Sequence, residues 1–246
     1  MTAGQNKSPV MTTGQNESPV MNLIFDADDT LWENNIYFER AFDEFVDYLD
    51  HSQLTPVEVR AVLDELEAVN ARIHGYGSLQ FGRNLQQVYQ HLSERHISED
   101  DLRAVMGFAE RILEQPIELM PGVNETLEYL ASRHELTICT KGHFDEQKMK
   151  IDRSGIGRYF AHAEIVKEKT ADAYRALIDA RRFPTETTWM IGNSPKSDIN
   201  PALEAGLRAV FIPHPRTWIL ERAEIREAPP GRLLQIDRFE ALREHF

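Results

Sequence analysis

The sequence is poor in cysteine and in long apolar runs. Its one cysteine, Cys139, lies inside the apolar run 136–140, where we expect a buried structural thiol. A single thiol excludes an intramolecular disulfide and a zinc site built from several cysteines. No stretch approaches the ~20 consecutive apolar residues that a membrane-spanning helix needs. We therefore expect a soluble, cytoplasmic protein that makes no membrane contact.

Basic side chains are also scarce. The 246 residues carry 27 Lys and Arg against 40 Asp and Glu, which gives a formal net charge of −13. This balance disfavours a nucleic-acid partner or an anionic membrane surface, because both attract basic proteins. The nine histidines show no HxH or HExxH spacing, so we expect no zinc site. The sequence makes no prediction of oligomeric state.

The first twenty residues are a direct repeat, MTAGQNKSPV followed by MTTGQNESPV. Both copies are polar and lack an apolar period. Such a segment buries too little surface to offset the entropy cost of ordering the chain. We predict that residues 1–20 form a disordered tail.

Residues 34–115 have an almost wholly helical pattern. Apolar residues recur there every three or four positions, as expected of amphipathic helices. Thr55-Pro-Val-Glu58 and Ser98-Glu-Asp-Asp101 have the capping-box pattern that starts a helix. We predict a third helix at 81–95 and a fourth at 98–114. Since about eighty helical residues exceed what a strand-to-strand connection requires, we predict a helical cap domain over 34–115.

Residues 21–33 and 116–246 alternate instead between strand and helix patterns. Strand segments are predicted at 23–25, 136–140, 164–166, 188–191 and 209–212, with a further candidate at 233–236. Alternation at this spacing requires a parallel sheet with right-handed crossovers. The predicted fold class is therefore α/β, a Rossmann-like parallel-sheet core with an inserted all-helical cap.

Polar residues follow several of the predicted strands. They are Asp26 and Asp28 after the first, Thr140, Lys141 and Gly142 after the second, Lys167 and Lys169 after the third, and 192–198 after the fourth. Because parallel strands end at one edge of a sheet, we expect these side chains to converge. Neighbouring carboxylates repel unless a cation intervenes, and oxygen ligands suit Mg²⁺. Carboxylates, a hydroxyl and an ammonium group are the parts for phosphoryl transfer through an aspartyl phosphate.

Four of these segments occur in the order and spacing of a known family's motifs. They are the DxDxT motif with Asp26, Asp28 and Thr30, the strand-ending Thr140, the lysine Lys169 before a helix, and Gly192 to Asp198 in place of GDxxxxD. From about Met21 to its end, the chain resembles the haloacid dehalogenase-like hydrolase superfamily. The similarity is to the subgroup with a helical cap after the first strand.

The resemblance implies a role for each matching residue. Asp26 would attack phosphorus, and Asp28 would protonate the leaving alcohol and then activate the hydrolytic water. Thr140 and the backbone amides of Lys141 and Gly142 would bind the phosphoryl oxygens. Lys169 would neutralise developing charge and fix the nucleophile.

The resemblance also implies a Mg²⁺ site. Its ligands would be the Asp26 carboxylate, the Asp28 main-chain carbonyl and Asp198. Asn193 belongs to the same site but stands where many members have aspartate. We expect this neutral amide to lie behind the ligands and to weaken Mg²⁺ binding without abolishing it.

Several residues have two interpretations. Lys167 competes with Lys169 for the lysine motif, and we favour Lys169 because it directly precedes the helix. Tyr76 and Phe81 either line the substrate pocket or only pack cap helices. We expect Asp29 to be structural, Trp218 to serve packing, and Thr30 to brace its loop through a side-chain to backbone bond.

The preferred function is a Mg²⁺-dependent phosphatase of a small soluble phosphorylated metabolite. A phosphomutase is an alternative, and so is a haloacid dehalogenase, although the family's dehalogenases lack the second acid found here as Asp28. A non-catalytic phospho-accepting module, similar to a receiver domain, is a further alternative. Receivers have no eighty-residue helical insertion, which argues against this last possibility.

Overall fold

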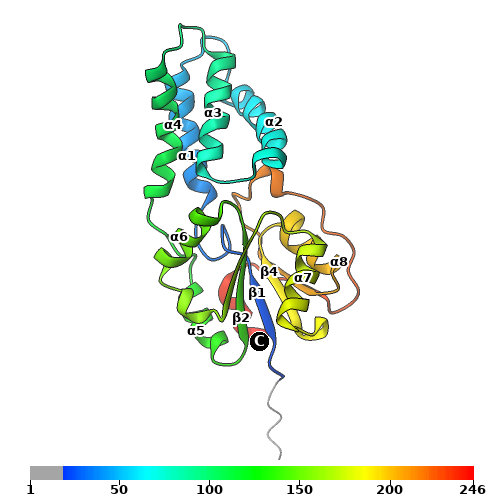
Figure 1. Ribbon diagram of the computed structural model, residues 1–246. Coiled ribbons are helices and arrows are strands. Elements are labelled where there is room, and N and C mark those ends of the chain that lie inside the picture. The colour runs from blue at the N-terminus through cyan, green and yellow to red at the C-terminus, as the bar shows by residue number, and fades with distance from the viewer. Residues whose placement is uncertain (1–18) are drawn as a thin grey trace, which may run out of the picture.

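The computed structural model describes residues 19–246, so the disorder predicted for residues 1–20 falls almost wholly outside the described residues. The core is a six-stranded sheet in the order β3-β2-β1-β4-β5-β6, with every neighbouring pair parallel. The strands are β1 (Asn22–Phe25), β2 (Glu135–Lys141), β3 (His162–Val166), β4 (Thr188–Gly192), β5 (Arg208–Phe211) and β6 (Leu233–Gln235). The predicted parallel α/β core is confirmed (Figure 1).

The central strand β1 serves both faces of the sheet because its side chains alternate. Leu23 and Phe25 pack on one face with residues of α5, and Ile24 packs on the other with residues of α7 and α8. Burying a side chain of this size stabilises the fold by about 1.5–3 kcal/mol. Cys139 is buried on the Ile24 face, as predicted. The helices around the sheet are α5 (Val123–Ala131), α6 (Phe144–Ser154), α7 (Ala171–Arg181) and α8 (Asn200–Glu204).

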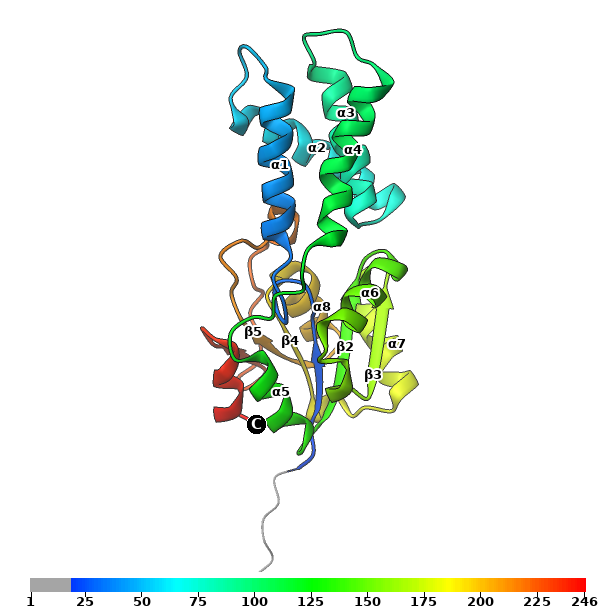
Figure 2. The ribbon, with the colours of Figure 1, turned by 90° about the vertical axis from the view of Figure 1, so that its left-hand side faces the viewer.

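Four helices between β1 and β2, here called the helical insertion, pack around a hydrophobic core of their own. They are α1 (Asn35–Leu49), α2 (Pro56–His74), α3 (Ser78–Leu92) and α4 (Glu99–Glu114). Figures 1 and 2 show them beyond the carboxyl end of β1, on the side of the sheet opposite the C-terminus. The capping boxes at Thr55 and Ser98 are both formed.

The third helix begins three residues earlier than predicted and ends three residues earlier. Gly77 precedes it with φ +122°, a conformation that favours glycine, so the chain turns into the helix at once. The amide and hydroxyl of Ser78 then donate to the Glu146 carboxylate of α6, each at 2.8 Å. This start of α3 therefore joins the helical insertion to the core.

Two chain segments connect the helical insertion to the sheet, and they run side by side. The Glu33 amide donates to the Glu118 carbonyl at 2.9 Å, and the Met120 amide donates to the Leu31 carbonyl at 2.9 Å. Trp32 of the outgoing segment is fully buried and forms an antiparallel bridge with Leu119 of the returning one. The outgoing and returning chains thus form one hydrogen-bonded connection beside the residues that follow β1.

The region after β4 differs in detail from its predicted helix at 199–205. A π-helical turn, Pro195–Ile199, comes first and α8 follows it. The candidate strand at 233–236 is present as the edge strand β6. Between β5 and β6 the chain is irregular apart from a 3₁₀ turn at Ile219–Glu221, which lies against α2.

Candidate active site

Asp26 lies at the point where the order of the strands reverses. The chain moves outward from β1 through β2 to β3 and then returns to place β4 on the other side of β1. Ligands of open α/β folds bind in the crevice beyond the strand ends at such a point. The Asp26 amide donates to the Ile191 carbonyl of β4 at 2.9 Å, which fixes Asp26 beside the loop that carries Asn193 and Asp198.

Lys169 bridges two buried carboxylates at this edge. Its ammonium group contacts Asp26 Oδ1 and donates to Asp198 Oδ1 at 2.8 Å. Burial, reinforced by the Asp198 charge, raises the pKa of Asp26 to about 7 although Lys169 opposes this shift. Burial also lowers the pKa of Lys169, but the two carboxylates outweigh it and hold that pKa above its ordinary value. Lys167, the competing lysine, is exposed.

Thr30 braces Asp26 through side chains and not through the backbone bond that we predicted. Its hydroxyl lies 2.9 Å from Asp26 Oδ2 and 3.3 Å from Asn193 Oδ1. The tight turn after β1 brings the carboxylate four residues back within reach of this hydroxyl. Asn193 also donates to the Thr217 hydroxyl at 3.2 Å, so its amide is held between two hydroxyl groups.

Asp198 is held in place by the loop that follows β4. The Ser194 amide donates to Asp198 Oδ2 at 2.9 Å, which leaves Oδ1 for Lys169. Gly192 is needed for this geometry, because a Cβ at that position would collide with the Asp198 carboxylate. The motif glycine therefore makes room for the carboxylate.

Asp28 is held by residues of α6 that the sequence analysis did not identify. Its carboxylate accepts from Gln147 Nε2 at 2.8 Å and from Trp32 Nε1 at 2.8 Å, and it pairs with Lys150 Nζ at 3.1 Å. Gln147 and Lys150 are three residues apart and so share one face of α6. That spacing, directly after a motif strand, was the available signal.

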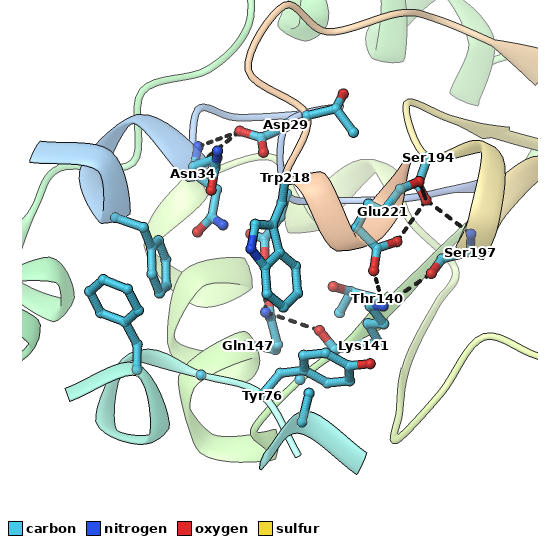
Figure 3. Close-up of a pocket in the computed structure, with 18 of the residues that line it drawn as sticks. Asp29, Asn34, Tyr76, Thr140, Lys141, Gln147, Ser194, Ser197, Trp218 and Glu221 are labelled. Atoms are coloured by element: carbon cyan, nitrogen blue, oxygen red, sulfur yellow. Dashed lines mark hydrogen bonds and ion pairs between the residues drawn. The ribbon is translucent and has the colours of Figure 1, made fainter. Parts of the chain in front are cut away.

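The end of β2 contributes Thr140, Lys141 and Gly142 to the same pocket. Thr140 is buried, while Lys141 Nζ contacts Glu221 and donates to Ser197 Oγ at 3.0 Å (Figure 3). The Gly142 amide donates to the Val166 carbonyl at 3.3 Å. Its φ of +144° favours glycine, and the Gln147 side chain packs where a Cβ would stand.

The opposite wall of the pocket is aromatic. Tyr76 and Phe81, the two predicted candidates, both line it, and so does Trp218. Trp218 packs, as predicted, and it has a second position-specific contact at this wall. Its indole donates to Glu67 Oε2 of α2 at 3.2 Å, and its ring lies edge-on to Tyr76 at 6.0 Å. Figure 3 shows Trp218 and Tyr76 together beside Lys141 and Thr140. Trp218 was missed because it lies in an irregular segment without periodicity.

Comparison with known proteins agrees with this geometry. A family model of haloacid dehalogenase-like hydrolases matches residues 20–206, about three quarters of the chain. The chain belongs to the haloacid dehalogenase-like hydrolase family. No curated protein matches the sequence. In the part of this hydrolase that the structure describes, no helix is both long and apolar enough to cross a membrane.

Solved structures of the family share the fold. A haloacid dehalogenase-like hydrolase from Xanthomonas campestris is similar with a TM-score of 0.77 and 26% identity, over 92% of this chain and 94% of that one. A 2-haloacid dehalogenase from Pseudomonas syringae has a TM-score of 0.62 and 20% identity, over 92% and 97%. A HAD-type hydrolase of Bacillus subtilis, described with bound magnesium, has a TM-score of 0.66 and 17% identity, over 92% and 98%.

The pocket of this hydrolase carries an excess of negative charge. Eight carboxylate side chains line it against four cationic ones, and each of the cationic groups already contacts a carboxylate. The donor atoms near Asp26 are oxygens, which suit a hard divalent cation. The residues present therefore fit such a cation, because it would offset the surplus negative charge.

Asp29 belongs to a different arrangement from Asp26 and Asp28. It has a φ of +61°, and one of its carboxylate oxygens accepts from the Asn34 and Asn35 amides at 2.9 Å each. Carboxylates at a helix start satisfy the free amides there. The structural role expected for Asp29 is therefore confirmed, since it fixes the beginning of α1.

Proposed function

We propose that this hydrolase is a Mg²⁺-dependent phosphatase that acts on a small phosphorylated metabolite through an aspartyl phosphate on Asp26. The observation that carries this proposal is the position of Lys169 between the carboxylates of Asp26 and Asp198 at the switch point of the sheet. A cation held there offsets the charge that would otherwise repel a phosphate group from a carboxylate nucleophile.

Two carboxylates divide the reaction between them. The Asp26 carboxylate attacks phosphorus, the bond to the ester oxygen breaks, and Asp28 gives its proton to the departing alcohol. Asp28 then takes a proton from water, the oxygen of that water attacks phosphorus, and phosphate departs from Asp26. One residue serves as acid and then as base because each step regenerates the state that the next requires.

The remaining motif residues bind and orient the phosphoryl group. Thr140, which is buried at the end of β2, offers its hydroxyl, and the Lys141 and Gly142 amides are the proposed backbone donors. The Gly142 amide donates to the Val166 carbonyl at 3.3 Å, and it would exchange this bond for one to a phosphoryl oxygen. Lys169 stays paired with Asp26 and Asp198 and stabilises the charge that develops on the phosphoryl oxygens.

We infer that Mg²⁺ is held by the Asp26 carboxylate, the Asp28 carbonyl and Asp198. Bound there, it would lower the repulsion between nucleophile and phosphate. Asn193 completes this site from behind, since its amide is already engaged by Thr30 and Thr217. The Bacillus subtilis neighbour described with bound magnesium supports the choice of this metal.

We further infer that residues 34–115 act as a cap over the core formed by 21–33 and 116–246, and that the protein is cytoplasmic. The pocket lies between the helical insertion and the strand ends, and two paired chain segments lead from one part to the other. Asp28 favours phosphate esters over haloacids as substrates, because an alcohol needs a proton to leave whereas a halide does not.

Hydrolysis of p-nitrophenyl phosphate tests the proposal. Purified protein is expected to release phosphate with Mg²⁺ and to stop when EDTA removes the metal. Asp26→Asn, which keeps the shape of the side chain, should abolish turnover. Asp29→Asn is the matched control, because the amide oxygen can still accept from α1, and it should retain turnover within a few-fold. Full activity of Asp26→Asn would rule out the mechanism.

A further inference from the structure

The part of the pocket formed by the helical insertion, away from the Asp26 end, is lined differently. Its charged side chains are Glu39, Arg60 and Glu67, and its apolar surface is aromatic. If the protein is the phosphatase proposed above, this region faces the leaving group of the ester. The side chains that line it then indicate what kind of alcohol the enzyme accepts as a leaving group.

Glu67 is the most distinctive group in this region. Glu67 is only 7% exposed, and the Trp218 indole donates to Glu67 Oε2 at 3.2 Å. No cationic side chain among residues 19–246 forms an ion pair with it. Burial raises the pKa of Glu67 to about 7, although Arg60 opposes the shift. A buried carboxyl that lines a pocket and lacks a cationic partner suits a hydrogen-bond donor from a ligand.

The charge of Arg60 is offset by a carboxylate. Its guanidinium donates to Glu39 Oε2 at 2.7 Å and lies 3.7 Å from the centre of the Phe42 ring. When Glu67 is ionised, the two carboxylates outweigh the one guanidinium, so this region repels a carboxylate or a second phosphate.

The neutral groups nearby suit hydroxyls and carbon-bound hydrogens. Asn84 Oδ1 already accepts from Asn70 at 2.8 Å and from Gln80 at 3.1 Å, which leaves the Asn84 NH₂ group as a donor for a ligand. The rings of Phe38 and Phe81, 5.1 Å apart and nearly perpendicular, form an apolar wall beside it. A ligand with hydroxyl groups can use both the Asn84 donor and the Glu67 acceptor, whereas a charged group can use only one.

We propose that this pocket selects phosphate esters whose leaving group is neutral and hydroxyl-bearing, such as polyol and sugar phosphates, and that Glu67 is the residue that rejects anionic leaving groups. The proposal rests on the phosphatase function. It distinguishes this enzyme from one built for phosphorylated carboxylic acids, which would present a free cation in place of Glu67.

A matched pair of substrates tests it. Glycerol 3-phosphate and 3-phosphoglycerate share a three-carbon skeleton and differ by a CH₂OH group in place of a carboxylate. At pH 8, where Glu67 is ionised, the unmodified enzyme should favour glycerol 3-phosphate by at least about tenfold in kcat/KM. Glu67→Gln removes the charge and keeps the shape, so it should reduce this ratio by about tenfold, mainly through a lower KM for 3-phosphoglycerate. Glu65→Gln, an exposed position on the same helix, should leave the ratio unchanged.

The possible outcomes separate this proposal from the one it rests on. Equal or better use of 3-phosphoglycerate by the unmodified enzyme would contradict it, as would an unchanged ratio in Glu67→Gln or a preference for O-phosphoethanolamine over glycerol 3-phosphate. If p-nitrophenyl phosphate is hydrolysed, those results overturn the selectivity alone. If p-nitrophenyl phosphate and both glyceryl esters all fail with Mg²⁺, the phosphatase function and the selectivity fall together.

Discussion

The two walls of the pocket follow different physical rules. At the strand ends, charged groups are paired with one another, as in Asp26 with Lys169 and Asp28 with Lys150. On the helical insertion, Glu67 is buried with only an indole donor, among aromatic rings and amides. In the proposed function, the wall at the strand ends binds the phosphoryl group, and the wall on the helical insertion binds the leaving group. Changes to the two walls should therefore have effects of different size and kind.

The largest loss of activity among these variants should come from Asp28→Asn, which removes the proposed acid and base. With glycerol 3-phosphate we expect a loss of about 10²–10⁴ in kcat/KM, because an alkoxide leaves poorly without a proton. With p-nitrophenyl phosphate the first equivalent of nitrophenol should still appear rapidly, because nitrophenolate is a good leaving group. Stopped-flow absorbance measures this burst. Equal slowing of the first turnover for both esters would show that Asp28 is not the acid.

Lys169→Met should cost about 10²–10³ in kcat, since it removes the cation that stabilises the phosphoryl charge. It also leaves Asp26 and Asp198 buried without their partner, so the melting temperature should change as well. Lys167→Met is the matched control, because that lysine lies two residues away and is exposed. Steady-state kinetics on both variants checks the assignment, and an inactive Lys167→Met would reverse it.

Glu67→Gln should change the stability of the protein as well as its substrate selectivity. Because burial raises the folded-state pKa of Glu67 to about 7, folding is opposed once the carboxyl ionises. The stability that its neutral form provides is complete below about pH 4.5 and is lost as pH rises towards 7. The variant should therefore exceed the unmodified protein by about 2–4 kcal/mol in unfolding free energy above pH 7. Urea titrations at pH 5 and pH 8 measure this difference, and a difference that does not grow with pH would contradict it.

The smallest effect should come from deletion of residues 2–20. Among residues 19–246, those that line the pocket lie between Asp26 and Glu221. The deleted segment is polar and has no apolar period, so we expect it to bury little surface against either wall. Turnover of p-nitrophenyl phosphate by the shortened chain should equal that of the full chain. A clear loss would show that the segment contributes to one of the walls.

The two walls also differ in how far the sequence predicts them. Asp26, Thr140 and Lys169 follow apolar strands, and a parallel sheet brings all strand ends to one edge, so their meeting was predictable from local pattern. Glu67 and Trp218 meet across more than a hundred residues, from a helix and an irregular segment. No periodicity carries that information, because the contact depends on how α2 packs over the core.

Some side-chain contacts at the strand ends could not be predicted from the sequence either. The sequence placed Asp28 near Asp26, but its partners Gln147 and Lys150 depend on how α6 is rotated against β2. Thr30 was expected to bond to the backbone, whereas the turn geometry gives it the Asp26 carboxylate instead. The strand segments, the parallel sheet and the buried thiol were thus accessible from composition and spacing, and side-chain pairing was not.

The central claim is that Asp26 becomes phosphorylated during turnover, and borohydride trapping tests it most directly. Borohydride reduces an acyl phosphate on aspartate to homoserine, which peptide mass spectrometry locates by residue. With Mg²⁺ and p-nitrophenyl phosphate, we predict homoserine at position 26 and none at position 28 or 29. Homoserine at another aspartate, or none at all while phosphate release proceeds normally, would contradict the proposed mechanism.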